Sequence, residues 1–110
     1  MDDWQKIDPA TAVQLLEDLK RAAVDRDLWR NRDMRETVAV LHGFGGYHSR
    51  LGTESYVHVF PAAAQAHLLV SGRGSPAFEE TTYGRVIEYC DLAIESISSD
   101  AEFHDARAAM

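Results

Sequence analysis

The stretch FEETTYGRVIEYCDLAIESIS, residues 78–98, decides the fold, because its apolar residues recur every three or four positions. That spacing places one side of an α-helix in a core and the other side in solvent. The apolar side consists of Tyr83, Val86, Ile87, Cys90, Ala93, Ile94 and Ile97. Charged residues fall on the opposite side. We therefore predict a helix over 78–98, followed by a short C-terminal helix.

A second helix is predicted over 9–29, before the middle of the chain. Asp8 is a favourable N-cap residue, and Pro9 suits the first helical turn, where an N–H group would have no partner. The apolar residues that follow recur at helical spacing and are Ala12, Leu16, Leu19 and Ala23. This helix is expected to bury that side against the rest of the core.

The segment from 34 to 51 carries mixed signals. Asp33 and Glu36 have the spacing of a capping box, which predicts a helix over 34–51. Three glycines and several β-branched residues weaken a helix in this segment. A strand over 37–41 is therefore the alternative.

The next segment, 54–71, has the same ambiguity. Its second half is rich in alanine and leucine and favours a helix, whereas 55–60 alternates like a strand. We predict an all-α fold: a single bundle of about four helices in one domain, 1–110. The alternative is an α+β fold with a hairpin formed by 37–41 and 55–60.

Composition limits the classes of partner and compartment. The chain has 110 residues and a net charge of −7, of which −5 falls in residues 56–110, so we expect no nucleic-acid partner. No apolar run approaches the roughly 20 residues of a membrane helix. The acidic N-terminus and the single cysteine, Cys90, lead us to expect a cytoplasmic protein. The five histidines lack the spacing of a zinc site, and we expect no metal or cofactor.

Function is predicted from charge rather than from a catalytic motif. The sequence shows no phosphate-binding loop and no nucleophile with a base and an orienting group. We predict a binding module that masks a basic protein, as immunity proteins, antitoxins and phage inhibitors do, and that is a monomer or a weak homodimer. The expected docking residues lie on the charged side of the 78–98 helix and are Glu79, Glu80, Glu88, Asp91 and Glu95. A secondary interface is expected at Tyr47, His48 and Tyr56.

Two other functions are compatible with the residues. Arg35 is followed after six residues by His42, and this spacing resembles the Arg-x(4–6)-His pattern of HEPN ribonucleases. The resemblance implies a dimeric, helical ribonuclease in which His42 is an acid or base and Arg35 stabilises charge. The third possibility is a small-ligand carrier whose pocket is walled by Tyr47, Tyr56, Phe60 and the histidines.

Overall fold

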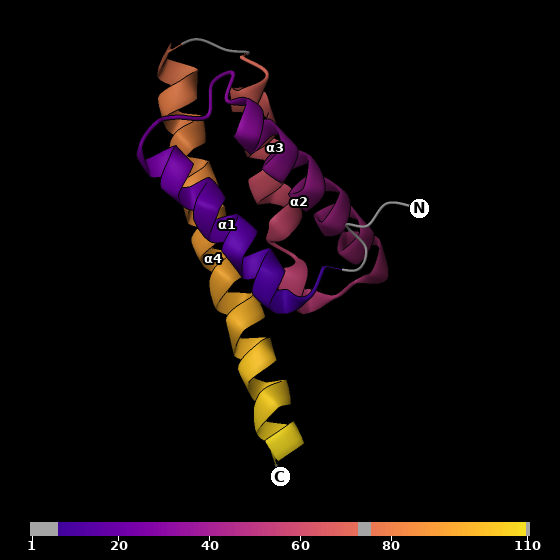
Figure 1. Cartoon of the computed structure of the whole chain (residues 1–110). Helices are drawn as coiled ribbons and strands as arrows, with labels where there is room; N and C mark the ends of the chain where they lie inside the picture. Colours follow the sequence, from indigo (N-terminus) through magenta and orange to yellow (C-terminus); the bar gives the residue numbers. More distant parts are fainter. Residues whose placement is uncertain (1–6, 73–75, 110) are drawn as a thin grey trace.

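The computed structural model confirms the all-α bundle. It describes residues 7–72 and 76–109, with side chains over 7–72 and 78–99. Its elements are α1 (Pro9–Val24), α2 (Arg32–Leu51), the short 3-10 helix η2 (Glu54–Tyr56), α3 (Val59–Val70) and α4 (Pro76–Ala109) (Figure 1). The described residues contain no strand, so the alternative hairpin is wrong: 37–41 lies inside α2, and 55–60 runs from η2 through a turn at 57–58 into α3.

Helix α1 begins as predicted but ends five residues early, at Val24 instead of residue 29. Asp8 Oδ1 accepts a hydrogen bond of 2.7 Å from the Thr11 N–H and caps the N-terminus. The early end follows from Arg26, which has a left-handed backbone (φ 57°). Its guanidinium donates to the Ala23 carbonyl at 2.8 Å and also bonds to Glu80 of α4. Tertiary contacts therefore overrode the helical pattern beyond Val24.

Helix α2 differs from the prediction only at its N-terminus. The N-cap is Asn31, whose Oδ1 accepts from the Met34 N–H at 3.1 Å. The predicted cap, Asp33, lies instead in the first turn, where its carboxylate still suits the helix dipole. At the C-terminus Gly52 takes a left-handed conformation (φ 71°), which stops the helix.

The predicted helix over 54–71 is divided in two. Residues 54–56 form the 3-10 turn, and α3 starts at Val59 with Pro61 in its first turn, where the missing N–H removes no helical hydrogen bond. Helix α4, in contrast, is longer than predicted, because 98–109 continues it instead of forming a separate short helix. No glycine or proline follows residue 98, so nothing in the sequence interrupts the helix there.

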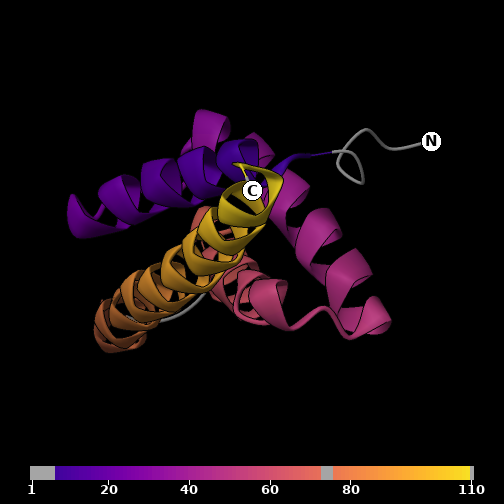
Figure 2. The ribbon, with the colours of Figure 1, turned by 90° about the horizontal axis from the view of Figure 1, so that it is seen from below.

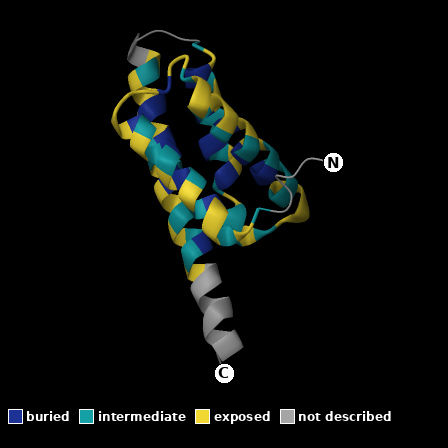
Figure 3. Cartoon of the chain, viewed as in Figure 1, coloured by how far each residue is buried: buried dark blue, intermediate teal, exposed yellow. Residues whose placement is uncertain are grey.

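The four helices share one apolar core. Helix α4 packs against both α1 and α3, and α2 packs mainly against α3 (Figure 2). The buried positions follow one side of each helix (Figure 3). The largest fully buried side chains include Leu16, Leu19, Leu28, Leu41, Phe44, Leu69 and Ile97. Within the described part of the chain, no helix combines the length and the apolar character needed to cross a bilayer.

Candidate functional site

Two adjoining clefts lie between α2 and α3, and together we name them the α2–α3 groove. The first has a volume of about 270 Å³ and is lined by Arg35, Val38, Ala39, His42 and His67. The second has a volume of about 420 Å³ and is lined by His42, Gly43, Gly46, Ser49, Arg50 and Phe60. His42 borders both clefts, so the two lie next to each other along α2.

Helical periodicity explains why these residues meet. Arg35, His42 and Ser49 are separated by seven residues each, so they lie on one side of α2. Phe60 and His67 are likewise seven residues apart on α3. The side of α2 next to this row is buried in the core, and the row itself borders α3.

Gly45 sets how closely α2 and α3 approach. A Cβ atom at this position would lie 2.6 Å from the backbone nitrogen of Phe60 and 2.8 Å from its Cα. Such distances are too short for real atoms, and backbone atoms cannot rotate away. Because residue 45 is a glycine, the backbones of α2 and α3 can contact each other directly. This contact brings Phe60 and His67 next to Arg35, His42 and Ser49 of α2.

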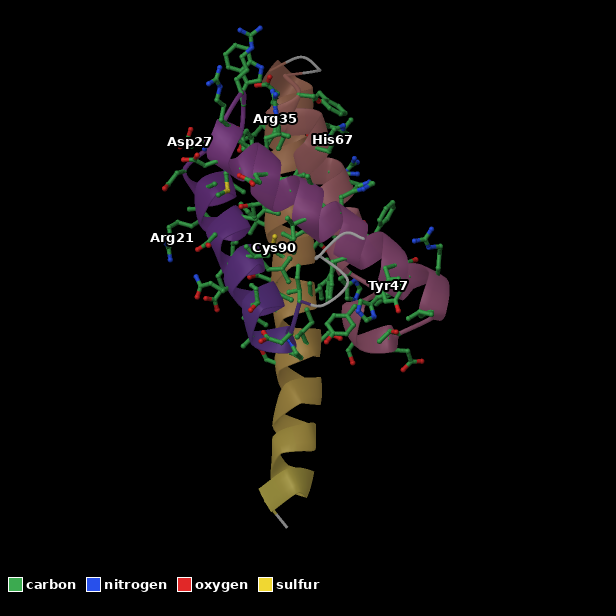
Figure 4. The ribbon with its side chains drawn as sticks, turned by 45° about the vertical axis from the view of Figure 1, so that its right-hand side comes forward. Arg21, Asp27, Arg35, Tyr47, His67 and Cys90 are labelled. Atoms are coloured by element: carbon green, nitrogen blue, oxygen red, sulfur yellow. The ribbon has the colours of Figure 1, made fainter. Side chains whose placement is uncertain are left out.

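The imidazole of His42 is central to the groove. Its ring centroid is 4.9 Å from that of Phe60 and 6.4 Å from that of His67. Arg35 borders the same cleft, and Figure 4 labels Arg35 on α2 and His67 on α3. The candidate pair Arg35 and His42 thus lines one cleft of a single chain, together with a second histidine from another helix. A ribonuclease role for the pair stays a prediction.

Sequence reasoning did not join His67 to this pair. The available signal was its position seven residues after Phe60, which places both residues on one side of α3. That signal identifies an exposed face of one helix but does not say which helix lies beside it. Only the packing of α3 on α2 shows the partnership.

The groove is locally basic in an acidic chain. Its described lining contains two arginines and two histidines and no carboxylate, although the whole chain has a net charge of −7. Helix α2 carries two carboxylates, Asp33 and Glu36, but neither lines the groove, and the next cleft beyond Ser49 contains that of Glu54 in η2. Guanidinium and imidazole groups donate hydrogen bonds well to phosphate and carboxylate oxygens. The chemistry of the groove therefore favours an anion.

Tyr47, His48 and Tyr56 form a separate aromatic cluster with Phe44. The His48 ring centroid lies 4.3 Å from that of Tyr56, 4.6 Å from that of Phe44 and 5.2 Å from that of Tyr47. His48 Nδ1 is 3.2 Å from Thr53 Oγ1, and burial lowers the pKa of the imidazole. The predicted secondary interface residues are thus gathered together, but they are half-buried and pack against one another.

The five predicted docking carboxylates are divided by the structure into two groups. Arg26 binds Glu80 through two hydrogen bonds, of 3.1 and 2.6 Å, and lowers the pKa of that carboxyl. Lys20 of α1 forms a 2.5 Å salt bridge with Asp91. The remaining members are Glu79, which is half-buried, and Glu88 and Glu95, which are exposed. Among the described side chains, these three take part in no salt bridge.

The remaining candidates for a reactive site are the thiol of Cys90 and the side chains that could bind a metal ion. Cys90 is buried, and desolvation raises the pKa of its thiol to about 12, so it packs as a small apolar residue. In the described ranges, no three histidine, cysteine or carboxylate side chains lie close enough to hold a metal ion.

None of the protein-family models, curated proteins or solved structures compared with the chain matches it.

Proposed function

We propose that the protein is a small binding module that takes an anionic ligand in the α2–α3 groove. The observation that supports it most is the meeting of Arg35, His42 and His67 around one cleft without a carboxylate in its described lining. The arrangement agrees with the ligand-carrier hypothesis for Phe60, His42 and His67, whereas Tyr47, Tyr56 and His48 lie in the separate cluster.

The surroundings of the cleft strengthen its attraction for an anion. Val38 and Ala39 provide apolar walls beside Arg35, and apolar walls lower the local dielectric constant, so that charges interact more strongly. A guanidinium offers several N–H donors in a fixed plane and suits a group with several oxygens. Concave sites with apolar walls and few polar groups are the usual form of small-molecule sites.

Titration with inorganic phosphate, followed by NMR of the histidine rings and backbone amides, tests this function. We expect shifts concentrated at His42, His67 and the neighbouring amides. The Arg35→Gln variant should lose them, because the best donor is gone. The Arg21→Gln variant is the matched control, since Arg21 is an exposed arginine on α1 outside the groove (Figure 4). Equal shifts in both variants, or none in the wild type, would contradict the proposal.

The second candidate function is docking of a basic protein on the outer face of α4. Glu88 and Glu95 favour it, because both carboxylates are exposed, outside the described salt bridges, and flank the 37% exposed Leu92. A complementary charge on the partner would speed association and make it sensitive to salt. With Glu80 and Asp91 paired internally, this surface is smaller than the sequence predicts.

A photo-crosslinking residue at position 92 tests the second candidate in cells that make the protein. We expect one basic protein to be captured, and a Glu88→Lys/Glu95→Lys variant to lose most of that adduct. The same crosslinker at the 61% exposed Leu51, on α2, is the control. Identical adducts from both positions, or adducts indifferent to the charge reversal, would show that α4 has no docking role.

A further inference from the structure

The two halves of the α2–α3 groove differ in chemistry. The half around Arg35 and His67 presents cationic and hydrogen-bonding groups. The half around Phe60 presents an aromatic ring beside Gly43 and Gly46, where α2 has no side chains, and its lining also includes Ser49 and Arg50. His42 lies between the two halves, 4.9 Å from Phe60 and 6.4 Å from His67 by ring centroids. A ligand that fits both halves needs an anionic group next to a planar apolar one.

The space over Phe60 is not explained by packing. A Cβ atom at Gly46 would lie 3.7 and 3.8 Å from Cδ2 and Cε2 of the Phe60 ring, which is ordinary van der Waals contact. Thus the fold has room for a methyl group at Gly46, unlike at Gly45. A glycine inside a helix is unfavourable relative to alanine. Here its effect is to leave the Phe60 ring uncovered, with 37% of the residue exposed to solvent.

The size of the groove agrees with a small aromatic ligand. Its two clefts measure about 420 and 270 Å³, and small-molecule sites usually measure roughly 300–1,000 Å³. Aromatic rings attract one another when their centroids are roughly 4.5–7 Å apart. A planar group in the larger cleft would therefore contact Phe60 and His42, while a group attached to it reached Arg35 and His67.

From these observations we infer that the ligand class is a phosphate monoester of a compact aromatic molecule. The phosphate lies between Arg35, His42 and His67, and the ring lies on Phe60 over Gly46. A tetrahedral phosphate suits donors that come from two different helices, because its oxygens point in several directions. A nucleoside monophosphate and a phenyl phosphate share this chemistry. The inference rests on the proposed function, since it needs the anion to enter the same groove.

Calorimetric titration of the full chain with four probes tests this inference: inorganic phosphate, phenyl phosphate, adenosine monophosphate and adenosine. We expect at least one of the two esters to bind about tenfold more tightly than phosphate or adenosine, because only an ester occupies both halves. If phenyl phosphate binds as tightly as adenosine monophosphate, the site recognises only an aromatic ring and a phosphate group. If the nucleotide is tighter, the sugar or base adds contacts.

Variants separate the two halves. Gly46→Leu fills the space over Phe60 and should reduce ester affinity about tenfold, to that of inorganic phosphate. Gly84→Leu is its control, because Gly84 is a helical glycine on the exposed side of α4 with no atom within 4 Å of a built Cβ. If Gly46→Leu fails to fold by circular dichroism, Phe60→Leu removes the ring with less change in volume. Arg35→Gln should weaken all anions.

The outcomes distinguish this inference from the proposed function. If phosphate binds in the groove and both esters bind no more tightly, the aromatic half is wrong and the proposed function stands. If no anion binds, both are wrong. If adenosine binds as tightly as its monophosphate, or if Gly46→Leu and Phe60→Leu leave ester affinity unchanged, the assignment of the ring to Phe60 is overturned.

Discussion

The contact between α2 and α3 differs in kind from the contact between α1 and α4. At Gly45 the backbones of α2 and α3 approach directly, with no side chain between them. Helices α1 and α4 pack through apolar side chains, and the exposed edge of their contact carries the Lys20–Asp91 salt bridge. Direct backbone contact depends on one residue and leaves an open groove beside it. The edge of the α1–α4 contact also has a cleft, of about 450 Å³, but its lining includes charges of both signs, Glu17, Lys20, Arg21 and Asp91. Contact through side chains tolerates more change.

Substitution of Gly45 should have the largest effect on stability, because it disrupts the direct backbone contact between α2 and α3. We expect Gly45→Ala to lower the free energy of unfolding by about 3 kcal/mol, at the upper end for overpacking, because the added methyl group meets backbone atoms of Phe60. The helix propensity of alanine opposes this loss by only about 1 kcal/mol. Urea denaturation measures the effect. An unchanged unfolding midpoint would mean that α3 moves aside easily.

Tyr83 makes a contact on the α4 side that we also expect to tolerate little change. Its hydroxyl accepts a buried hydrogen bond of 3.1 Å from the Leu28 N–H in the loop after α1. Tyr83→Phe leaves that N–H without this partner, at a loss of about 1–3 kcal/mol. Thermal unfolding compares the variant with the wild type. Loss of less than about 0.5 kcal/mol would show that water replaces the hydroxyl.

The same substitution at Gly84, a second helical glycine, tests whether the effect of Gly45→Ala depends on the contact with α3. Gly84 lies on the exposed side of α4, and no atom is within 4 Å of a built Cβ. We expect Gly84→Ala to raise the free energy of unfolding by about 1 kcal/mol, because alanine favours the helix and meets no neighbour. Opposite signs at Gly45 and Gly84 in one urea series support the distinction. Equal signs would remove it.

The smallest expected effect is the dependence of folding stability on pH that His48 of the aromatic cluster causes. Burial lowers the pKa of its imidazole in the folded chain, whereas the unfolded chain keeps a value of about 6.5. Below that pH the unfolded chain binds the proton more readily, so stability falls as the pH decreases from 7 to 5. His48→Phe keeps an aromatic ring without the titration and should flatten this dependence. Parallel profiles for variant and wild type would contradict it.

Much of the candidate site was accessible from sequence as separate parts. The spacing of Arg35 and His42 placed both on one side of a helix, and Phe60 and the histidines were expected to wall a pocket. Their combination with His67 was not accessible, because periodicity describes one helix at a time. The acidic surface shows the converse. The five carboxylates could be selected from the sequence, but the partners of Glu80 and Asp91, which are Arg26 and Lys20, come from other elements.

The sequence by itself determined the helices over 9–24 and 78–98 and the buried side of α4, since the period of apolar residues is a local property. It left a strand open in the segments that form α2 and α3. It also determined the start of α1, where Asp8 and Pro9 act within one turn. Tertiary structure alone decided the end of α1, because Arg26 is held by Glu80 of α4. It also decided the α2–α3 groove. A groove exists only where two helices meet, and Gly45 allows that meeting without indicating which helix will approach.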